Sequence, residues 1–183
     1  MILGIDPGVR KVGYALINPD LTIVDSGILL LEKKSPTRQD QFERMIQIND
    51  FFTELIKKHK ITTVCMEQLF FTKFNQSNAE FVYGIRAILL TLCINNKITI
   101  KEITPIQLKK YVTGNSKAEK KLVQNCIMKI FKLKECPEFN DAADALALAY
   151  IANKMKESPP PPLYPQDSLR SQRGEPNIES LLW

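Results

Sequence analysis

Histidine and paired cysteines are almost absent from this sequence. It has one histidine, His59, in a lysine-rich stretch typical of a solvated helix end, and four cysteines without a Cys-x-x-Cys pair. This pattern argues against Cys-His catalysis, multi-histidine metal sites, zinc sites and a disulfide framework. The cysteines are instead predicted to be reduced, mostly buried thiols: Cys65, Cys93, Cys126 and Cys136. Any bound metal must therefore be held mainly by carboxylates.

Long apolar runs are also missing. No stretch approaches the roughly 18–20 consecutive apolar residues that a membrane span needs, and the N-terminus lacks the basic start and apolar stretch of a signal peptide. The apolar fraction of 44% is ordinary for a globular protein. We therefore expect a cytoplasmic protein with one globular domain, residues 1–156, followed by a tail, residues 157–183.

The expected tail has a composition unlike that of the domain. Pro159–Pro162 is a polyproline run, which is typical of an extended spacer. Few apolar residues follow until Ile178–Trp183, where four of the six residues are apolar. The segment is predicted to be either a frayed, disordered tail or a short docking motif for a partner.

Positive charge is unevenly distributed along the chain. The net charge of the whole sequence is +5, whereas residues 101–134 alone hold nine lysines and two glutamates. Such a stretch is either a solvated helical face or, beside a nuclease site, a surface that contacts nucleic-acid phosphates.

Hydrophobic periodicity predicts an α/β fold. Three strands lead the chain, the second and third joined by a tight hairpin at Pro19-Asp20, and strands separated by helices follow. The predicted strands are residues 2–5, 12–17, 21–31, 62–66 and 98–103, and the predicted helices are residues 38–58, 78–95, 105–112, 117–131 and 140–154. This order indicates a mixed five-stranded sheet with helices on both faces.

Four carboxylates lie in unexpectedly apolar surroundings. Asp6 and Glu67 each end an apolar strand, and Asp141 and Asp144 open an otherwise apolar helix, three residues apart and so on nearly the same helix face. Helix capping would explain Asp141, but it explains neither Asp144 nor the strand-end acids. The four side chains would converge if the two strands were parallel neighbours and the last helix packed over them.

A converging group of carboxylates repels itself when ionised, and hard divalent cations relieve that repulsion. Mg²⁺ takes oxygen ligands together with waters and phosphate oxygens. Two such ions about 3.5–4 Å apart stabilise both the attacking and the leaving oxygen of an in-line phosphodiester displacement. The four acids therefore predict a site for two Mg²⁺ ions, in which Mn²⁺ can substitute, and a nuclease that needs no nucleophilic side chain.

Three segments resemble the acidic motifs of the RuvC-type Holliday-junction resolvases. They are Ile2-Leu3-Gly4-Ile5-Asp6-Pro7-Gly8, Glu67-Gln68-Leu69-Phe70 and Asp141-Ala142-Ala143-Asp144-Ala145-Leu146-Ala147. Their order, spacing and flanking residues agree with the family, and residues 113–120 resemble its basic loop and helix start. The likeness spans about residues 1–153.

This resemblance implies a ribonuclease-H-like fold and a homodimer with one active site per subunit. Such a dimer would bind a four-way (Holliday) junction during homologous recombination and DNA repair. It would nick two strands of like polarity symmetrically and leave 5′-phosphate and 3′-hydroxyl ends. The four acids would be the catalytic metal ligands, and a branch-migration helicase complex would be a further partner.

The resemblance also implies DNA contacts. Phe70 aligns with an aromatic residue that stacks on bases near the crossover, and Lys109 and Lys120 align with basic residues near the scissile phosphate. An exposed ring can stack on an unpaired base, and lysines can neutralise charge on a phosphate. Core packing is the alternative for Phe70, and ordinary solvation is the alternative for the lysines. Lys73 and Lys117 are further expected DNA contacts.

One segment departs from the family pattern. Residues 83–87 read Tyr-Gly-Ile-Arg-Ala where the family usually has a Gln-Ala-Arg-Gly run, and the preceding loop is about one residue longer. The resemblance implies that this helix and loop help to form the dimer interface and to position the aromatic residue. The departure therefore bears on junction geometry rather than on metal chemistry.

Three other functions are alternatives to a junction endonuclease. A related nuclease acting on RNA ends would use similar acids, but the loop after Glu67 and the lysine-rich stretch favour the junction enzyme. An actin-like ATPase would need a second phosphate loop and a glycine-rich adenosine motif, and the chain has only seven glycines. A non-catalytic junction-binding protein would have no need of all four acids.

Overall fold

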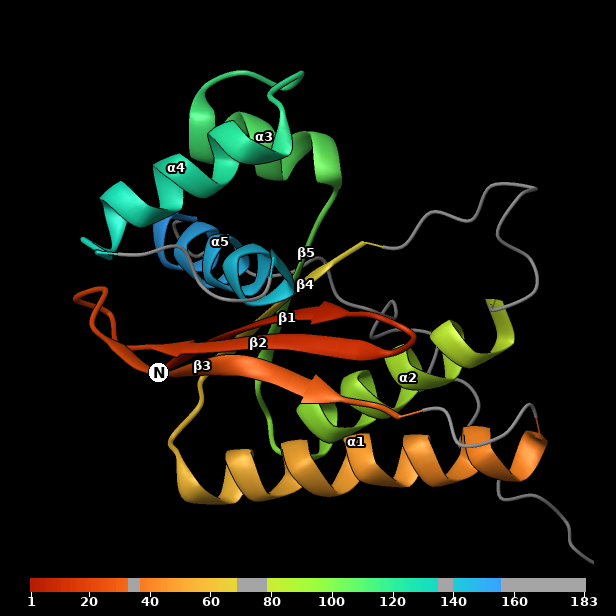
Figure 1. Cartoon of the computed structure of the whole chain (residues 1–183). Helices are drawn as coiled ribbons and strands as arrows, with labels where there is room; N and C mark the ends of the chain where they lie inside the picture. Colours follow the sequence, from red (N-terminus) through yellow and green to blue (C-terminus); the bar gives the residue numbers. More distant parts are fainter. Residues whose placement is uncertain (33–36, 69–78, 135–139, 156–183) are drawn as a thin grey trace, which may run out of the picture.

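The computed structural model of the chain describes residues 1–32, 37–68, 79–134 and 140–155 (Figure 1). Its strands are β1 (Ile2–Pro7), β2 (Lys11–Ile17), β3 (Ile23–Leu30), β4 (Thr63–Glu67) and β5 (Thr99–Ile103). Its helices are α1 (Arg38–Lys58), α2 (Ala79–Asn95), α3 (Pro105–Thr113), α4 (Lys120–Ile130) and α5 (Asn140–Lys154). The predicted α/β class and order of elements are confirmed. No described helix is long and apolar enough to cross a membrane.

The five strands form one mixed sheet in the order β3-β2-β1-β4-β5. The first three strands pair antiparallel, as predicted, and β4 pairs parallel to both β1 and β5. In Figure 1, α3, α4 and α5 cover one face of this sheet, and α1 and α2 cover the other. The centre of the sheet is therefore buried between two helical layers.

Three predicted boundaries are corrected. The first strand extends to Pro7 rather than ending at residue 5. The helix expected from residue 117 begins at Lys120, because Glu119 is its N-cap and Lys117 lies in the preceding turn, where its amide donates to Asn115 Oδ1 at 2.9 Å. The third strand begins at Ile23 rather than at residue 21. Leu21 has a left-handed φ of 70° and its amide donates to Asn18 O at 3.0 Å, so it completes the predicted hairpin turn.

The hydrophobic core is divided by the sheet into two clusters. Side chains of a strand alternate between faces, and in β1 and β4 the residues Leu3, Ile5, Val64 and Met66 enter the cluster under α1 and α2. Ile2 and Cys65 enter the other cluster, together with Ala145 and Ala149 of α5. Asp6 follows Ile2 by four residues and Glu67 follows Cys65 by two, so each acid is on the same face of its strand as that residue. Both acids are therefore directed to the face that α5 covers.

Two glycines allow α5 to lie unusually close to the sheet. A methyl group on Gly4 would collide with the carbonyl oxygen of Ala145 and would lie 2.7 Å from the Ala149 amide nitrogen. A methyl group on Gly13 would collide with the backbone carbonyl of Asp141. Glycine in a strand often marks such a close approach of another backbone. The two positions therefore set the height of α5 above β1 and β2.

The cysteine prediction is confirmed for the described part of the chain. Cys65 and Cys93 are buried free thiols, and Cys126 is a partly buried free thiol. Burial raises the pKa of the Cys65 thiol to about 12 and that of Cys93 to about 11, so neither is a reactive thiolate. Cys136 and the predicted tail, residues 157–183, lie outside the described residues.

Candidate active site

Asp6 and Glu67 lie at neighbouring strand ends on the same edge of the sheet. The parallel register pairs Ile5 with Met66, so the next residue of each strand is Asp6 in β1 and Glu67 in β4. Both side chains are directed to the α5 face, and both residues are partly buried. The sequence folds this way because the apolar residues preceding each acid fill the core and leave the acid at its rim.

Asp141 and Asp144 are brought over these strand ends by the first turns of α5. Gly13 pairs with Asp6 across β1 and β2, and a methyl group on Gly13 would lie 3.1 Å from the Cβ of Asp141. Asp141 therefore lies above Gly13, the β2 residue that pairs with Asp6. Asp144 is one helical turn further along, and its side chain is only 17% exposed.

Electrostatics link Asp6 and Glu67 to the acids of α5. The pKa of Asp6 is raised from 3.8 to about 7, chiefly by burial and then by the charges of Glu67, Asp144 and Asp141, while Lys120 opposes the shift. Burial also raises the pKa of Glu67, and the charge of Asp144 adds to it. The two strand ends and the first turns of α5 therefore lie near enough for the charges of their acids to interact.

Lys120 supplies positive charge to this group. Its Nζ lies 2.8 Å from Asp144 Oδ2, and its side chain is 54% exposed. Burial lowers the pKa of Lys120, but the hydrogen bond to Asp144 and the charges of Asp144, Asp141 and Asp6 outweigh burial and leave the pKa above its ordinary value. Lys120 is therefore an ammonium that partly neutralises the acids at neutral pH.

The donor chemistry of the four acids fits Mg²⁺, but the side chains are not already arranged around a metal. All four offer hard carboxylate oxygens. The pKa of Asp6 is raised by burial and then by repulsion from the other acids, and a divalent cation would relieve that repulsion. Within the described ranges, however, no three His, Cys, Asp or Glu side chains gather closely enough to hold a metal ion. Metal binding therefore requires rearrangement of the acidic side chains.

The other predicted site residues are placed less centrally or lie outside the described part of the chain. Lys109 is partly buried on α3, where its carbonyl accepts a hydrogen bond from Thr113 Oγ1 at 2.8 Å. Lys117 is exposed in the turn before α4. Phe70 and Lys73 lie outside the described residues. Lys120 is thus the predicted lysine for which a contact with the acids is observed.

Comparison with known proteins places this site in a family. Residues 2–152 match the family described as "Crossover junction endodeoxyribonuclease RuvC". The chain belongs to the RuvC family. A RuvC of Fusobacterium nucleatum is 37% identical over 150 residues, which are 80% of this chain and 76% of the relative. A RuvC of Prochlorococcus marinus is 34% identical over 158 residues, which are 85% of this chain and 99% of the relative.

A solved RuvC structure has the same fold. The structure described as T. thermophilus RuvC in complex with Holliday junction substrate aligns with a TM-score of 0.70, over 81% of this chain and 88% of that chain, at 23% sequence identity. The ribonuclease-H-like fold expected from the sequence motifs is therefore shown. The motifs from which the RuvC resemblance was inferred lie within the matched range.

Sequence reasoning missed a buried ion pair that supports this RuvC site. Arg44 Nε lies 3.0 Å from Asp40 Oδ2, with the side chains 5% and 4% exposed. Arg44 Nη1 donates to Val9 O at 3.0 Å, and the guanidinium lies 4.2 Å from the centre of the Phe81 ring. Arg44 thus joins the turn that follows Asp6 to α1 and α2. The i, i+4 spacing of the pair was visible in the sequence, but its burial was not.

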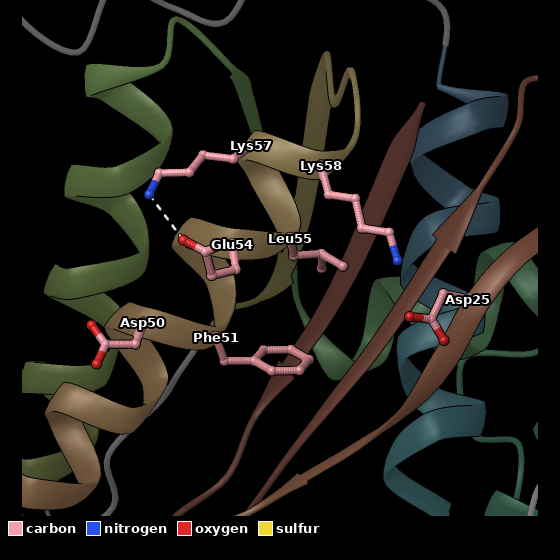
Figure 2. A pocket seen from close by; sticks show the side chains of 7 residues that line it. All are labelled: Asp25, Asp50, Phe51, Glu54, Leu55, Lys57 and Lys58. Carbon is pink, nitrogen blue, oxygen red and sulfur yellow. Dashed lines mark hydrogen bonds and ion pairs between the residues drawn. The ribbon is translucent and has the colours of Figure 1, made fainter.

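A pocket on the other side of the sheet is separate from the RuvC acids. It lies between α1 and the edge strand β3, and Figure 2 shows its lining of Asp25, Asp50, Phe51, Glu54, Leu55, Lys57 and Lys58. Phe51 and Leu55 belong to the cluster under α1 and α2, which is opposite the α5 face. Its charges are mixed, and Lys57 pairs with Glu54 at 2.9 Å. This pocket contributes nothing to the site of the four acids.

Proposed function

We propose that this chain resolves four-way DNA junctions by hydrolysing phosphodiester bonds at Asp6, Glu67, Asp141 and Asp144, in homologous recombination and DNA repair. The observation that carries the proposal is the meeting of these acids, from two strand ends and the first turns of α5, in a chain of the crossover junction endodeoxyribonuclease family. A RuvC with the same fold binds a Holliday junction substrate.

The four acids are proposed to hold two Mg²⁺ ions. Bound at these carboxylates, such ions would lower the pKa of a water molecule and neutralise charge on the attacking and leaving oxygens. Hydrolysis joins the oxygen of water to phosphorus and breaks the bond from phosphorus to the 3′ oxygen. The water loses a proton and the 3′ oxygen gains one, so the products carry a 5′-phosphate and a 3′-hydroxyl group.

Lysines at this site are proposed to act on the DNA phosphate. Lys120 lies against Asp144 but is half exposed, so its ammonium can turn to a phosphate oxygen where negative charge develops. Lys109 and Lys117 come from α3 and from the turn before α4, on the same side of the sheet. Phe70 and Lys73 remain proposed contacts with unpaired bases and the backbone near the crossover.

The chain is proposed to act as a homodimer in the cytoplasm, with a branch-migration helicase complex as a further partner. Phe42 and Ile46, on successive turns of α1, are 49% and 58% exposed, and Tyr83 of α2 is 54% exposed. These helices lie on the face opposite the acids (Figure 1). Two copies joined through α1 and α2 would keep both active sites free for symmetric nicking, and would have twice the 20.9 kDa mass of one chain.

Cleavage of synthetic substrates tests this proposal. The protein should introduce paired nicks into a four-way junction with Mg²⁺, and should leave linear duplex and RNA/DNA hybrid intact. Activity should be lost in EDTA. Asp6→Asn should bind the junction in EDTA as wild type does but should cut at least about a hundredfold more slowly, because metal-ion catalysis contributes several kcal/mol to such reactions.

The matched control is Asp50→Asn, which removes an exposed acid of α1 on the opposite side of the sheet. This variant should cleave at the wild-type rate. Cleavage by Asp6→Asn at the wild-type rate would refute the site assignment. Cleavage restricted to RNA-containing substrates would instead favour a ribonuclease.

A further inference from the structure

The end of α4 that lies away from the four acids forms a small basic groove. Asn125, Met128, Lys129, Lys132 and Leu133 line it, and its volume is about 400 Å³. Lys129 and Lys132 are both exposed. Among the residues that the structure describes, no carboxylate pairs with either lysine. The groove therefore presents two positive charges, one amide side chain and a partly apolar floor to solvent.

The backbone around the groove is fixed by the fold. The Leu133 amide donates to Met128 O at 2.9 Å and the Phe131 amide donates to Ile127 O at 3.0 Å, which closes the end of α4. Ile127 is fully buried. The Phe131 ring packs edge to face on Tyr150 of α5, with ring centres 6.4 Å apart. The two lysines therefore project from a rigid support rather than from a loose loop.

Lys132 stands at a position where glycine is the favoured residue. Its φ is 52°, in the left-handed region that commonly terminates helices. A side chain there is strained, whereas glycine adopts this conformation without cost. Lys97 has the same conformation, with a φ of 57°, just beyond α2. It is an exposed lysine on the other helical layer and so offers a matched comparison.

The groove and the candidate active site lie at opposite ends of a single helix. α4 begins at Lys120, which contacts Asp144, and ends beside the groove. At 1.5 Å per residue, Lys129 lies about 14 Å along the helix axis from Lys120, and Lys132 lies just beyond the end of the helix at Ile130. In a B-form arm, a length of about 14 Å corresponds to roughly four base pairs. Lys121, exposed in the first turn of α4, adds positive charge between the two ends.

We propose that this groove is a second phosphate-binding site, which holds the backbone of one junction arm while the scissile phosphate lies at the four acids. The inference rests on the proposed function, because it requires that phosphate to lie beside Lys120. The ligand is a phosphodiester of duplex DNA, and recognition is by charge rather than by base sequence. The site gives junction affinity and arm orientation without taking part in the chemistry.

The test compares a double variant, Lys129→Ala with Lys132→Gly, with the single variant Lys97→Gly. Replacement of Lys132 by glycine relieves backbone strain, so the double variant is expected to fold. Binding to a synthetic four-way junction is measured in EDTA over a range of salt concentrations. Affinity should fall about tenfold in the double variant, and the salt slope should fall by about two, as expected for two lost phosphate contacts. Lys97→Gly should bind as wild type does.

A second measurement locates the contact on the DNA. Single phosphates along one arm are replaced by uncharged methylphosphonates. Replacement several base pairs from the scissile phosphate should weaken binding of the wild type but not of the double variant, because the contact is already absent from it. With Mg²⁺ and saturating protein, the double variant should cut the junction at the wild-type rate.

The outcomes separate the two proposals. If the wild type cuts the junction but the double variant keeps wild-type affinity and salt slope, the groove does not bind DNA and the proposed function stands. Equal weakening by Lys97→Gly would show a general effect of net charge and would also overturn the assignment. If the wild type neither binds nor cuts the junction, the proposed function fails and this inference fails with it.

Discussion

At the scale of single residues, Asp6 is held in a conformation that disfavours its own charge. It is largely buried and faces three other acids, and its pKa is raised to about 7 as a result. Lys120 offsets only part of this repulsion. Such a carboxylate would favour binding of a cation, but it lowers the free energy of unfolding of the metal-free protein. This conflict between function and stability is common at functional sites.

This conflict predicts a pH-dependent stability of the metal-free protein. A carboxyl whose folded pKa lies above its unfolded value of 3.8 contributes stability that is complete at low pH and is lost as the pH rises through about 7. Asp6→Asn removes this loss. At pH 8 in EDTA, the variant should have a higher free energy of unfolding than wild type, by up to about 4 kcal/mol, and the difference should vanish near pH 4.

Denaturant unfolding at several pH values measures this difference. Asp50→Asn, the exposed acid of α1, should show no comparable pH-dependent gain. Mg²⁺ should raise the stability of the wild type at pH 8 more than that of Asp6→Asn, because it binds the ionised group in the folded state. A variant less stable than wild type at pH 8 would contradict the view that Asp6 is electrostatically strained.

At the scale of elements, the sequence predicted the helix boundaries that depend on local residue patterns. The predicted helix starts at residues 38 and 105 agree with the starts of α1 and α3, and the structure shows a full capping box between Thr104 and Gln107. The start of α4 was misplaced by three residues. Gly114 ends α3 with a φ of 78°, and a turn through Asn115 precedes the next helix; periodicity does not reveal such a turn.

Tertiary contacts between distant elements could not be predicted from the sequence. The motif around Asp6 was recognised as a strand end, yet nothing in it showed that Gly4 is needed by a helix about 140 residues later. Lys101 was counted with the basic stretch, but its Nζ donates to the carbonyls of Ala152 and Met155 and closes the end of α5. Arg44 likewise finds Val9 and Phe81 only in the fold.

The close approach of α5 predicts a severe effect of Gly4→Ala. The added methyl group would meet backbone atoms of Ala145 and Ala149, which cannot move without displacing the helix. We expect a loss of about 3 kcal/mol or more in the free energy of unfolding. At temperatures where the variant remains folded, junction cleavage should also fall, because Asp141 and Asp144 move with the helix.

Gly27→Ala is the matched control for this prediction. Gly27 lies in the edge strand β3, and its nearest neighbour would be the hydroxyl oxygen of Tyr14 at 3.3 Å, at the end of a side chain that can shift. Chemical denaturation should therefore show a much smaller change for Gly27→Ala. Equal effects of the two substitutions would mean that helix position does not depend on Gly4.

At the scale of the whole molecule, the sheet separates two surfaces with different properties. The face of the sheet that α3, α4 and α5 cover carries the acids and most of the lysine-rich stretch of residues 101–134. The layer of α1 and α2 carries exposed apolar side chains, among them Phe42 and Ile46. The sequence singled out the four acids as a candidate site, since each ends or begins a well-defined element. It could not show that Lys120 contacts Asp144.

The most direct measurement of metal binding is anomalous diffraction from crystals of the wild type and of Asp6→Asn soaked in Mn²⁺. For the wild type we predict two peaks about 3.5–4 Å apart, coordinated by oxygens of Asp6, Glu67, Asp141 and Asp144, with Lys120 no longer bound to Asp144. Asp6→Asn should lose at least one peak. Density for Mn²⁺ elsewhere, with the four acids unchanged and Lys120 still on Asp144, would contradict the proposed active site.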